Sequence, residues 1–181
     1  SINIKKIRFQ IYDLEKIVVQ KNQKRFDPRL YVIIDEKYID KMPLNEMIGI
    51  LQDNGATMVQ LRIKSLPDKK FYYYGERIKN LITNPKLKFI INNRIDIAMS
   101  LDADGIHLGQ EDIPLKSARE LIGEKFIIGV SVHNLREALS AQKGKADYLG
   151  VGAVFSTKTK QVARVCGIHL ISKFRKKIKI P

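Results

Sequence analysis

Short apolar runs alternate with stretches of helical periodicity along most of the chain. The apolar runs lie at 30–34, 57–63, 88–91, 105–108, 126–130 and 147–150. Runs this short and continuous are typical of strands buried on both faces of a parallel sheet. Helical spacing of apolar residues lies between them at 43–52, 68–82, 95–99, 115–122 and 134–142. The alternation predicts repeated strand–helix units around a parallel sheet.

The last third of the pattern is less complete. We expect the sixth strand to run on into 151–155, a helical turn or more at 168–173, and the start of a seventh strand at 178–180. A TIM-type (β/α)8 barrel is the favoured architecture, apparently lacking its last strand or strands in this chain. A doubly wound open sheet is the alternative, but no glycine-rich dinucleotide fingerprint follows the first strand. An unclosed barrel exposes strand edges, which predicts a homo-oligomer.

The segment before the first strand has a different character. Residues 1–29 are basic and partly amphipathic, which predicts a helical N-terminal extension, and 30–181 form the barrel domain. The whole chain has 181 residues, 33 Lys and Arg against 19 Asp and Glu, and a formal net charge of +14. Such a balance attracts phosphates, either of nucleic acid or of small substrates. Few aromatic residues are interleaved with the cations of the C-terminal tail, so nucleic acid is the less favoured partner.

Composition excludes several other classes of protein. The single cysteine, Cys166, excludes a disulfide framework and a thiolate metal site, and it fits a reducing, cytoplasmic location. No apolar run approaches the roughly 20 residues that a membrane helix needs. The N-terminus lacks the apolar core and the cleavage site of a secretory signal.

Polar side chains mark the points where strands end. Gln60, Arg62 and Lys64 alternate at the end of the second strand, which predicts that they share one face. An amide and two cations there are suited to a di- or triphosphate, although a charged rim is the plain alternative. In a barrel these positions lie at the catalytic mouth.

The next strands end in oxygen donors. Asn92 and Asn93 follow the third strand, and they either cap the next helix or offer oxygens to a ligand or Mg²⁺. His107, Glu111 and Asp112 follow the fourth strand. The two carboxylates either neutralise the cations of the second strand or bind Mg²⁺ that bridges to a pyrophosphate. A histidine standing alone, such as His107, is more often structural than catalytic.

A glycine- and hydroxyl-rich loop follows the sixth strand. It begins at Gly150 and Gly152 and continues through Thr157 and Thr159 to Lys160. Glycines let backbone amides approach an anion, and the hydroxyls and the lysine add donors. The spacing of a Walker loop is absent, so this is a phosphate cradle of only moderate specificity.

Taken together, four stretches resemble the thiamine-phosphate synthase family of (β/α)8 barrels. They are GATMVQLRIKS, FIINNRIDIAMSLDADGIHLGQEDIP, IIGVSVHNLREAL and ADYLGVGAVFSTKTKQVARVCGI. The resemblance implies a transferase of thiamine biosynthesis. It would join 4-amino-2-methyl-5-hydroxymethylpyrimidine pyrophosphate to thiazole phosphate, with Mg²⁺ as cofactor. Departure of pyrophosphate would leave a carbocation-like species, which the thiazole nitrogen captures.

The resemblance also implies roles for single residues. Gln60 would hold the pyrimidine, Ser131 would lie between pyrimidine and pyrophosphate, and His107 would line the substrate site. The pyrophosphate would be held by Arg62, Lys64, Asn92 and Lys160. Asn93 and Asp112 fall at the Mg²⁺ ligands, and Thr157 and Thr159 at the thiazole phosphate. Arg62, Lys64, Ser131 and Lys160 are the candidate catalytic residues.

Three departures from the family pattern keep other readings open. The family usually has Asp at the position of Asn93 and an acid at that of Val162, and its chains continue into two further strand loops. These departures favour a non-catalytic or truncated member that binds a thiamine precursor or a protein partner. A related thiazole tautomerase branch uses a histidine in a Ser-Val-His stretch, which His133 fits. The retained cations and Asp112 favour the synthase.

Overall fold

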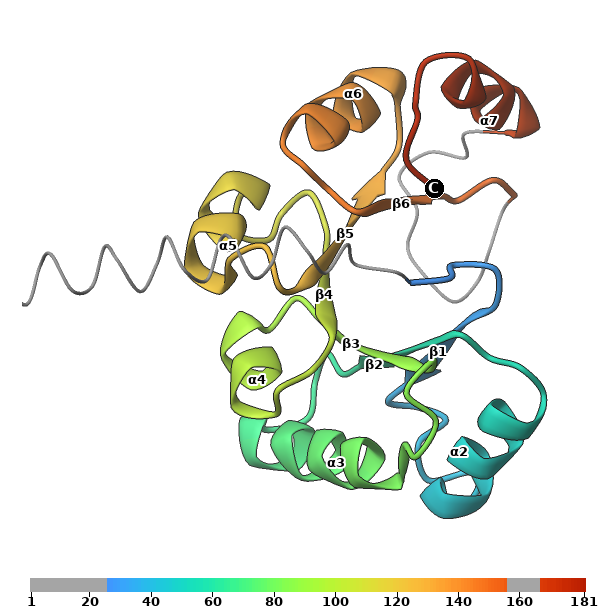
Figure 1. The fold of residues 1–181 in the computed structure, drawn as a ribbon, viewed down its shortest axis with the longest axis vertical. Coiled ribbons are helices and arrows are strands. Elements are labelled where there is room, and N and C mark those ends of the chain that lie inside the picture. Colours follow the sequence, from blue (N-terminus) through green and yellow to red (C-terminus); the bar gives the residue numbers. More distant parts are fainter. Residues whose placement is uncertain (1–25, 156–166) are drawn as a thin grey trace, which may run out of the picture.

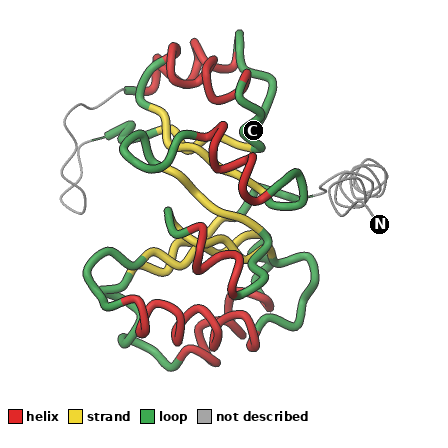
Figure 2. The backbone as a smooth tube through the Cα atoms, turned by 90° about the vertical axis from the view of Figure 1, so that its left-hand side faces the viewer, coloured by secondary structure: helices red, strands yellow, loops and turns green. Residues whose placement is uncertain are grey.

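Six parallel strands form one sheet in a computed structural model that describes residues 26–155 and 167–181. Each strand pairs with the next along the chain, from β1 to β6, and the sheet curves as an incomplete barrel wall (Figures 1 and 2). The strands are β1 (Tyr31–Asp35), β2 (Met58–Arg62), β3 (Lys88–Asn92), β4 (Gly105–Leu108), β5 (Ile127–Val132) and β6 (Tyr148–Val151). The chain is therefore an α/β protein with a six-stranded parallel half-barrel.

The helices lie on the outer side of the curved sheet (Figure 2). They are α2 (Leu44–Asp53), α3 (Asp68–Leu81), α4 (Ile95–Ser100), α5 (Leu115–Ile122), α6 (Leu135–Lys143) and α7 (Ile168–Arg175). Prolines 43, 67 and 114 stand immediately before α2, α3 and α5. Among the described residues, no helix is long and apolar enough to cross a membrane.

Two expectations for the end of the chain were wrong. The sixth strand ends at Val151 and does not continue to 155, because its ladder with β5 ends at the pair Val132–Val151. Residues 178–180 are not a strand. One backbone bond, from the Leu149 N–H to the Pro181 carbonyl (2.8 Å), joins this segment to β6, whereas a ladder needs several in register. The helix expected within residues 1–29 falls largely outside the described residues.

Strand alternation divides the apolar side chains into two groups. The larger core lies between the sheet and the helices and includes Leu61, Phe89, Ile106 and Ile128, all essentially inaccessible to solvent. The second core is formed by Met58, Ile90, Ile127 and Tyr148, with Phe26 and Tyr31 packed against it. Because these strand residues face away from the helices, they form the floor of the concave side of the sheet.

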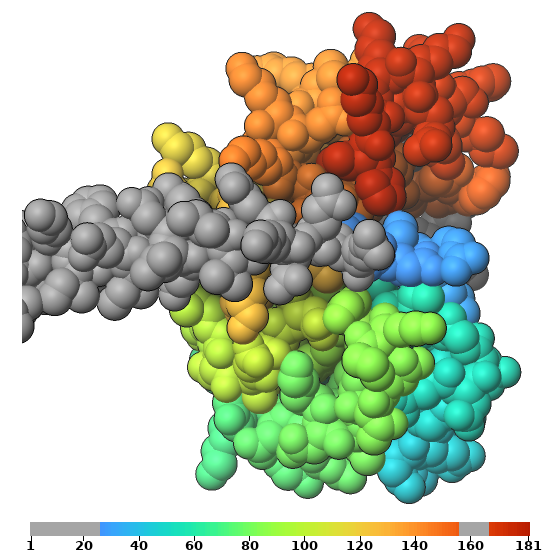
Figure 3. Space-filling view, viewed as in Figure 1, coloured from blue at the N-terminus to red at the C-terminus, as the bar shows by residue number. Residues whose placement is uncertain are grey.

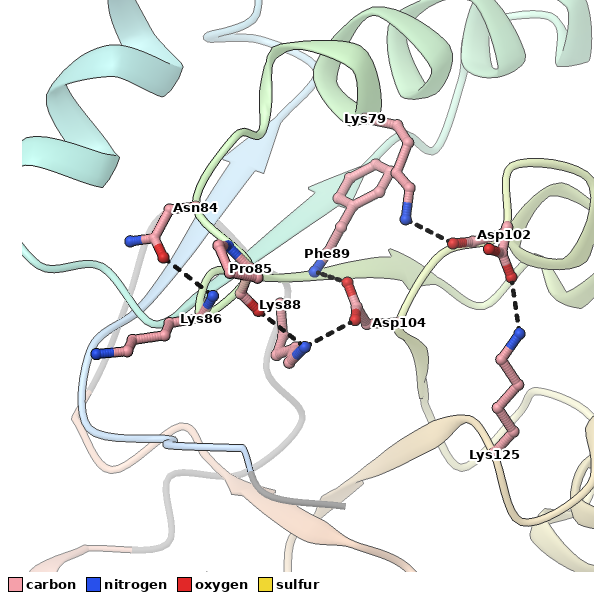
Figure 4. A network of polar contacts seen from close by, with 9 residues as sticks. All are labelled: Lys79, Asn84, Pro85, Lys86, Lys88, Phe89, Asp102, Asp104 and Lys125. Atoms are coloured by element: carbon pink, nitrogen blue, oxygen red, sulfur yellow. Dashed lines mark hydrogen bonds and ion pairs between the residues drawn. The ribbon is translucent and has the colours of Figure 1, made fainter. Parts of the chain in front are cut away.

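Aspartates tie adjacent strands together at their amino ends. Asp104, just before β4, accepts the Phe89 N–H (2.9 Å) and pairs with Lys88 (3.2 Å), as Figure 4 shows. Asp147, just before β6, accepts the Ile128 N–H in the same way (2.7 Å). In each case a side chain satisfies a backbone donor on the neighbouring strand, so both residues support the sheet at the end away from the strand carboxyl ends.

The segment that leads into β1 lies against the last described strand. The Phe26 and Tyr148 rings are 5.9 Å apart, and the Tyr31 ring meets Tyr148 edge to face at 5.6 Å. In the space-filling view, this blue segment lies between the red C-terminal part and the green helices (Figure 3). The contact between Tyr31 and Tyr148 therefore joins β1 and β6, the first and last of the described strands, across the concave side.

Candidate functional site

A cavity of about 630 Å³ opens on the concave side of the sheet, toward the carboxyl ends of the strands. Its polar lining comes from Tyr31, Asp35, Lys37, Tyr38, Gln60, Arg62, Asn92, His107, Ser131, His133 and Tyr148. A site at the carboxyl ends of parallel strands is where barrel enzymes place their chemistry. The volume is within the range of small-molecule pockets.

The structure brings together five of the candidate residues. Gln60, Arg62, Asn92, His107 and Ser131 all line this cavity, from strands β2 to β5. Lys64, Asn93 and Asp112 do not line it. Thr157, Thr159, Lys160 and Val162 lie outside the described residues.

Lys64 lies beyond the end of β2. Strand β2 ends at Arg62, so the alternation that groups Gln60 with Arg62 does not extend to Lys64. The Lys64 backbone N–H instead donates to Glu36 at 2.8 Å, and the residue is exposed.

Arg62 is neutralised by a residue that the sequence reading missed. Its guanidinium donates to the Asp35 carboxylate, and the two residues are register partners on β1 and β2. Glu111 and Asp112, expected as its possible counter-charges, are not its partners in the structure: Glu111 is exposed and Asp112 pairs elsewhere. Asp35 ends β1 just as Arg62 ends β2. The rule that singled out polar residues at strand ends could therefore have found Asp35 as well.

Asn93 and Asp112 lie side by side at the rim. Asn93 has a positive φ of 50°, which Asn and Asp adopt more readily than other residues with a side chain. Its amide donates to Asp112 Oδ1 at 3.3 Å, and Asp112 Oδ2 accepts the Gly109 N–H at 2.6 Å. A backbone bond from Asn93 N to His107 O (2.9 Å) ties this turn to β4.

These two side chains fit a magnesium ion in the chemistry of their donors. Mg²⁺ is usually bound by one or two carboxylates together with phosphate oxygens and water, and rarely by a full protein cage. Asp112 offers a carboxylate, and rotation of the Asn93 amide would offer a carbonyl oxygen. Among the described residues no three His, Cys, Asp or Glu side chains gather as a ligand set. The site therefore suits a metal that brings most of its ligands with the substrate.

A continuous chain of hydrogen bonds crosses the cavity floor. Gln60 Nε2 lies 2.5 Å from the Tyr31 hydroxyl, which lies 2.8 Å from the Tyr148 hydroxyl. Tyr148 in turn lies 3.0 Å from His107 Nδ1, and His107 Nε2 lies 2.9 Å from Ser131 Oγ. Five strands each contribute one residue, and Gln60 and Tyr148 are 2 % and 4 % exposed.

Burial keeps Tyr31 and Tyr148, the two tyrosines of this hydrogen-bond network, neutral. It raises the pKa of Tyr31 to about 12, and it also raises the pKa of Tyr148 well above its ordinary value. The two tyrosines were read as apolar strand residues, so sequence reasoning missed them. Their shared position on the inward face of β1 and β6 becomes visible only once the strands are paired.

His133 stands on the cavity wall just beyond β5. Its ring Nδ1 lies 3.1 Å from Glu137, which also accepts the His133 backbone N–H at 2.8 Å. Glu137 belongs to the first turn of α6, whose cap residue Asn134 accepts the Glu137 N–H. The helix cap therefore holds the imidazole in place.

The arrangement suits a flat polar ring that carries an anionic group. Apolar side chains such as Met58 and Ile90 pack around the amide, imidazole and hydroxyl groups of the floor, which can address the edge of a heterocycle. Arg62 stands near the mouth of the cavity, with a planar fork of donors for phosphate oxygens. The rim carboxylate of Asp112 is not a partner of this arginine, so it is left to bind a cation.

Comparisons with known proteins agree with this chemistry. A family model described as thiamine monophosphate synthase matches residues 30–181. The thiamine-phosphate synthase of Clostridium acetobutylicum is 41 % identical over 158 residues, covering 87 % of this chain and 75 % of that protein. The thiamine-phosphate synthase of Pyrococcus furiosus is 42 % identical over 153 residues, covering 84 % of this chain and 72 % of that protein.

Solved structures give the same result. A thiamine phosphate pyrophosphorylase from Pyrococcus furiosus superposes with a TM-score of 0.73 at 40 % identity, covering 84 % of this chain and 71 % of that chain. An N-acetylmannosamine-6-phosphate 2-epimerase from Clostridium perfringens, at 18 % identity and a TM-score of 0.58, shares the fold.

Proposed function

The chain belongs to the thiamine monophosphate synthase family, a family of transferases, and from that premise we propose that it makes thiamine phosphate. The reaction would join 4-amino-2-methyl-5-hydroxymethylpyrimidine pyrophosphate to thiazole phosphate and release pyrophosphate. The bond between the pyrimidine methylene carbon and the pyrophosphate oxygen breaks, and the thiazole nitrogen forms the new bond to that carbon.

One observation carries the proposal beyond the family match. The cavity gathers Gln60, Arg62 and Ser131 on the wall that a pyrimidine pyrophosphate would face. An amide matches the adjacent donor and acceptor of an aminopyrimidine edge, and an arginine matches a phosphate. An enzyme for this reaction must mainly orient two substrates and stabilise departing negative charge, which such a wall supplies.

The residues of this chain would divide the work by position. Gln60, at the buried floor, would orient the ring. Arg62 and Asn92 would hold the pyrophosphate near the mouth, with Lys64 and Lys160 approaching it from the rim and the loop after β6. Ser131 would donate its hydroxyl hydrogen between the two groups. Thr157 and Thr159 would hold the thiazole phosphate.

Magnesium would complete the site at the rim. Asn93 and Asp112 are the residues that would hold it, and it would supply positive charge to the departing pyrophosphate. Arg62 remains ion-paired to Asp35 until an anion arrives, so the chain's own cation has a counter-charge in the free protein.

The proposal is tested by following both products together. The purified chain would be given Mg²⁺ and both substrates, and thiamine phosphate and pyrophosphate are expected in equal amounts. Arg62→Gln should lower kcat/KM by about 10²–10³-fold, the usual loss when a donor to developing charge is removed. Arg77→Gln, an exposed arginine of α3 outside the cavity, is the matched control and should leave the rate unchanged. A folded chain that binds pyrophosphate but forms no product would instead be a binding member of the family.

A second candidate function rests on His133. Its place on the cavity wall, with the ring held by Glu137, is the geometry of a proton-transferring base. Conversion of a thiazole tautomer without any pyrimidine substrate, lost in His133→Gln, would favour a tautomerase. Unaltered thiamine phosphate formation in the same variant would favour the synthase.

A further inference from the structure

We propose that Tyr148 is a positioning residue that, with Tyr31 and His107, fixes the direction of hydrogen bonding across the cavity floor, from Gln60 to Ser131. The direction decides which atoms the cavity offers to a ligand as donors and which as acceptors. The kinetic consequence rests on the proposed function, but the directional chain itself is a property of the free protein.

Tyr148 reaches its partners because β5 carries no side chain between them. His107, Gly129 and Tyr148 are in register across β4, β5 and β6. A Cβ atom at Gly129 would overlap the Tyr148 ring, so the glycine leaves the space through which the tyrosine lies over β5. The Tyr148 and His107 ring centroids are 5.5 Å apart. The tyrosine therefore bridges two strands that are not neighbours in the sheet.

Because the Gln60 amide lies with Nε2 toward Tyr31, satisfying the hydroxyls of the chain selects one direction. If Gln60 donates to Tyr31, Tyr31 to Tyr148 and Tyr148 to His107 Nδ1, then each hydroxyl accepts once and donates once. In the reverse direction, with the amide so placed, Tyr31 would accept twice, and the described residues supply no acceptor for its own hydrogen. A largely buried hydroxyl without a protein partner is costly, so the first arrangement is favoured.

This direction fixes the tautomer of His107. A histidine whose Nδ1 accepts from Tyr148 carries its hydrogen on Nε2 when neutral. Nε2–H then donates to Ser131 Oγ, 2.9 Å away. The Ser131 hydroxyl hydrogen is consequently directed to the cavity, where it can be donated to an anionic or acceptor atom of the ligand.

The other end of the chain is fixed in the same way. Because one hydrogen of Gln60 Nε2 is donated to Tyr31, the amide cannot rotate without losing that bond. Gln60 thus keeps its carbonyl and its second N–H in set places, as recognition of an aminopyrimidine edge requires. Tyr148 stabilises both ends although it bonds directly to neither Gln60 nor Ser131.

The first test measures the His107 tautomer by ¹⁵N NMR in the metal-free, ligand-free protein. The chain has three histidines, and His107→Asn assigns the signal. We expect the Nε2–H form in the wild type and a mixture of both forms in Tyr148→Phe, which removes the donor to Nδ1. Tyr74→Phe is the matched control, since that hydroxyl bonds to Asp40 (2.9 Å) outside the cavity, and it should leave the His107 signal unchanged.

Two NMR results would overturn the proposal. One is an Nδ1–H tautomer in the wild type, and the other is an unchanged Nε2–H tautomer in Tyr148→Phe. Neither result depends on whether the chain makes thiamine phosphate. Failure of this inference and failure of the proposed function are therefore distinguishable.

The second test is kinetic and separates the two substrates. Tyr148→Phe should raise KM for the pyrimidine pyrophosphate and lower kcat, together costing about tenfold or more in kcat/KM, because Gln60 and Ser131 are held less firmly. KM for the thiazole phosphate should stay within about twofold. A variant that is folded, as shown by an unchanged circular dichroism spectrum, and has unaltered constants would show Tyr148 to be only a packing residue. An equal loss of kcat/KM toward both substrates would also show Tyr148 to be only a packing residue.

Discussion

Arg62 and Asp35 face each other across the first two strands and form an ion pair at the mouth of the cavity. Their side chains are 19 % and 14 % exposed, so neither charge is fully solvated. A ligand phosphate that approaches Arg62 meets a guanidinium already bonded to a carboxylate. Asp35 therefore both orients the arginine and competes with the anion.

Replacing this carboxylate should change anion binding. Asp35→Asn keeps the shape of the side chain but removes the competing charge, so we expect pyrophosphate to bind several-fold more tightly at low salt. Unfolding free energy should fall by about 1–3 kcal/mol, because Arg62 loses the partner of a half-buried pair. Calorimetric titration with pyrophosphate and urea unfolding measure the two effects.

A control for the added positive charge is Asp53→Asn, at the exposed end of α2. This variant should change neither the affinity for pyrophosphate nor the free energy of unfolding measurably. Weaker pyrophosphate binding by Asp35→Asn would mean that orienting Arg62 matters more than removing the competitor.

From the contact between Asn93 and Asp112 at the rim, we predict that the stability of the protein depends on Mg²⁺. Asn93→Asp replaces the bond from the amide to Asp112 with two adjacent carboxylates. Without metal the variant should be less stable, and Mg²⁺ should restore that stability at roughly tenfold lower concentration than the wild type requires, because the site gains a negative charge. Melting temperature as a function of Mg²⁺ measures this without reference to activity.

Asn80→Asp, on the exposed surface of α3, adds the same charge away from the rim. Its Mg²⁺ profile should follow that of the wild type. Identical profiles for Asn93→Asp and the wild type, in melting and in activity, would remove Asn93 from the metal site.

The strands were predictable from the sequence because buried parallel strands are short and continuously apolar. The runs at 105–108 and 88–91 agree with β4 and β3 to within one residue. The glycine-rich stretch after β6 was misread, since apolar residues continue past Val151 although the pairing with β5 does not. Hydrophobicity locates a strand, whereas the number of ladder partners decides where it ends.

The part of the candidate site that is formed by polar residues at the carboxyl ends of strands was predictable from the sequence. That rule found Gln60, Arg62 and His107, because parallel strands bring their carboxyl ends to one edge. It could not identify partners, so Asp35 was missed as the counter-charge of Arg62. It also could not show that Tyr148 crosses over Gly129, a contact that depends on the register of three strands.

We predict that a substitution at the amino ends of the strands, away from the cavity, lowers stability strongly and changes catalysis little. Arg119 is buried, donates to the Phe126 carbonyl (2.7 Å) and pairs with Asp147 (2.7 Å). Asp147→Ala leaves that arginine without its counter-charge and Ile128 N without its acceptor. The expected loss is about 3–5 kcal/mol of unfolding free energy, measured in urea.

The matched control is Asp102→Asn, because Asp102 has a positive φ of 46° that Asn also tolerates. Asp102 forms an exposed ion pair with Lys125 (3.2 Å; Figure 4), and such pairs contribute less than about 1 kcal/mol. Both variants should keep the substrate KM values of the wild type at low temperature. Equal destabilisation by the two changes would show that burial of the Arg119 pair does not matter.

The hydrogen bonds of the Glu36 carboxylate should make the stability of the protein depend on pH in a specific way. Its carboxylate accepts the backbone N–H groups of Lys64 (2.8 Å) and Ser65 (2.9 Å) and so connects the turn after β1 to the loop after β2. These backbone bonds lower the pKa of Glu36 from its ordinary value of 4.5 to about 2. As the pH falls below 4.5 the unfolded chain takes up the proton first, so this stabilisation is complete above that value and is lost as the pH falls toward 2.

Glu36→Gln should remove this contribution. The variant is expected to be about 1 kcal/mol less stable than the wild type at neutral pH, a small value because solvent screens the site. The difference should shrink as the pH is lowered from 4.5 toward 2, since only the wild type then loses the charged bonds. Urea unfolding across this range measures it, and Glu46→Gln on α2 controls for the removal of one negative charge. A difference independent of pH would mean that Glu36 acts through its shape rather than its charge.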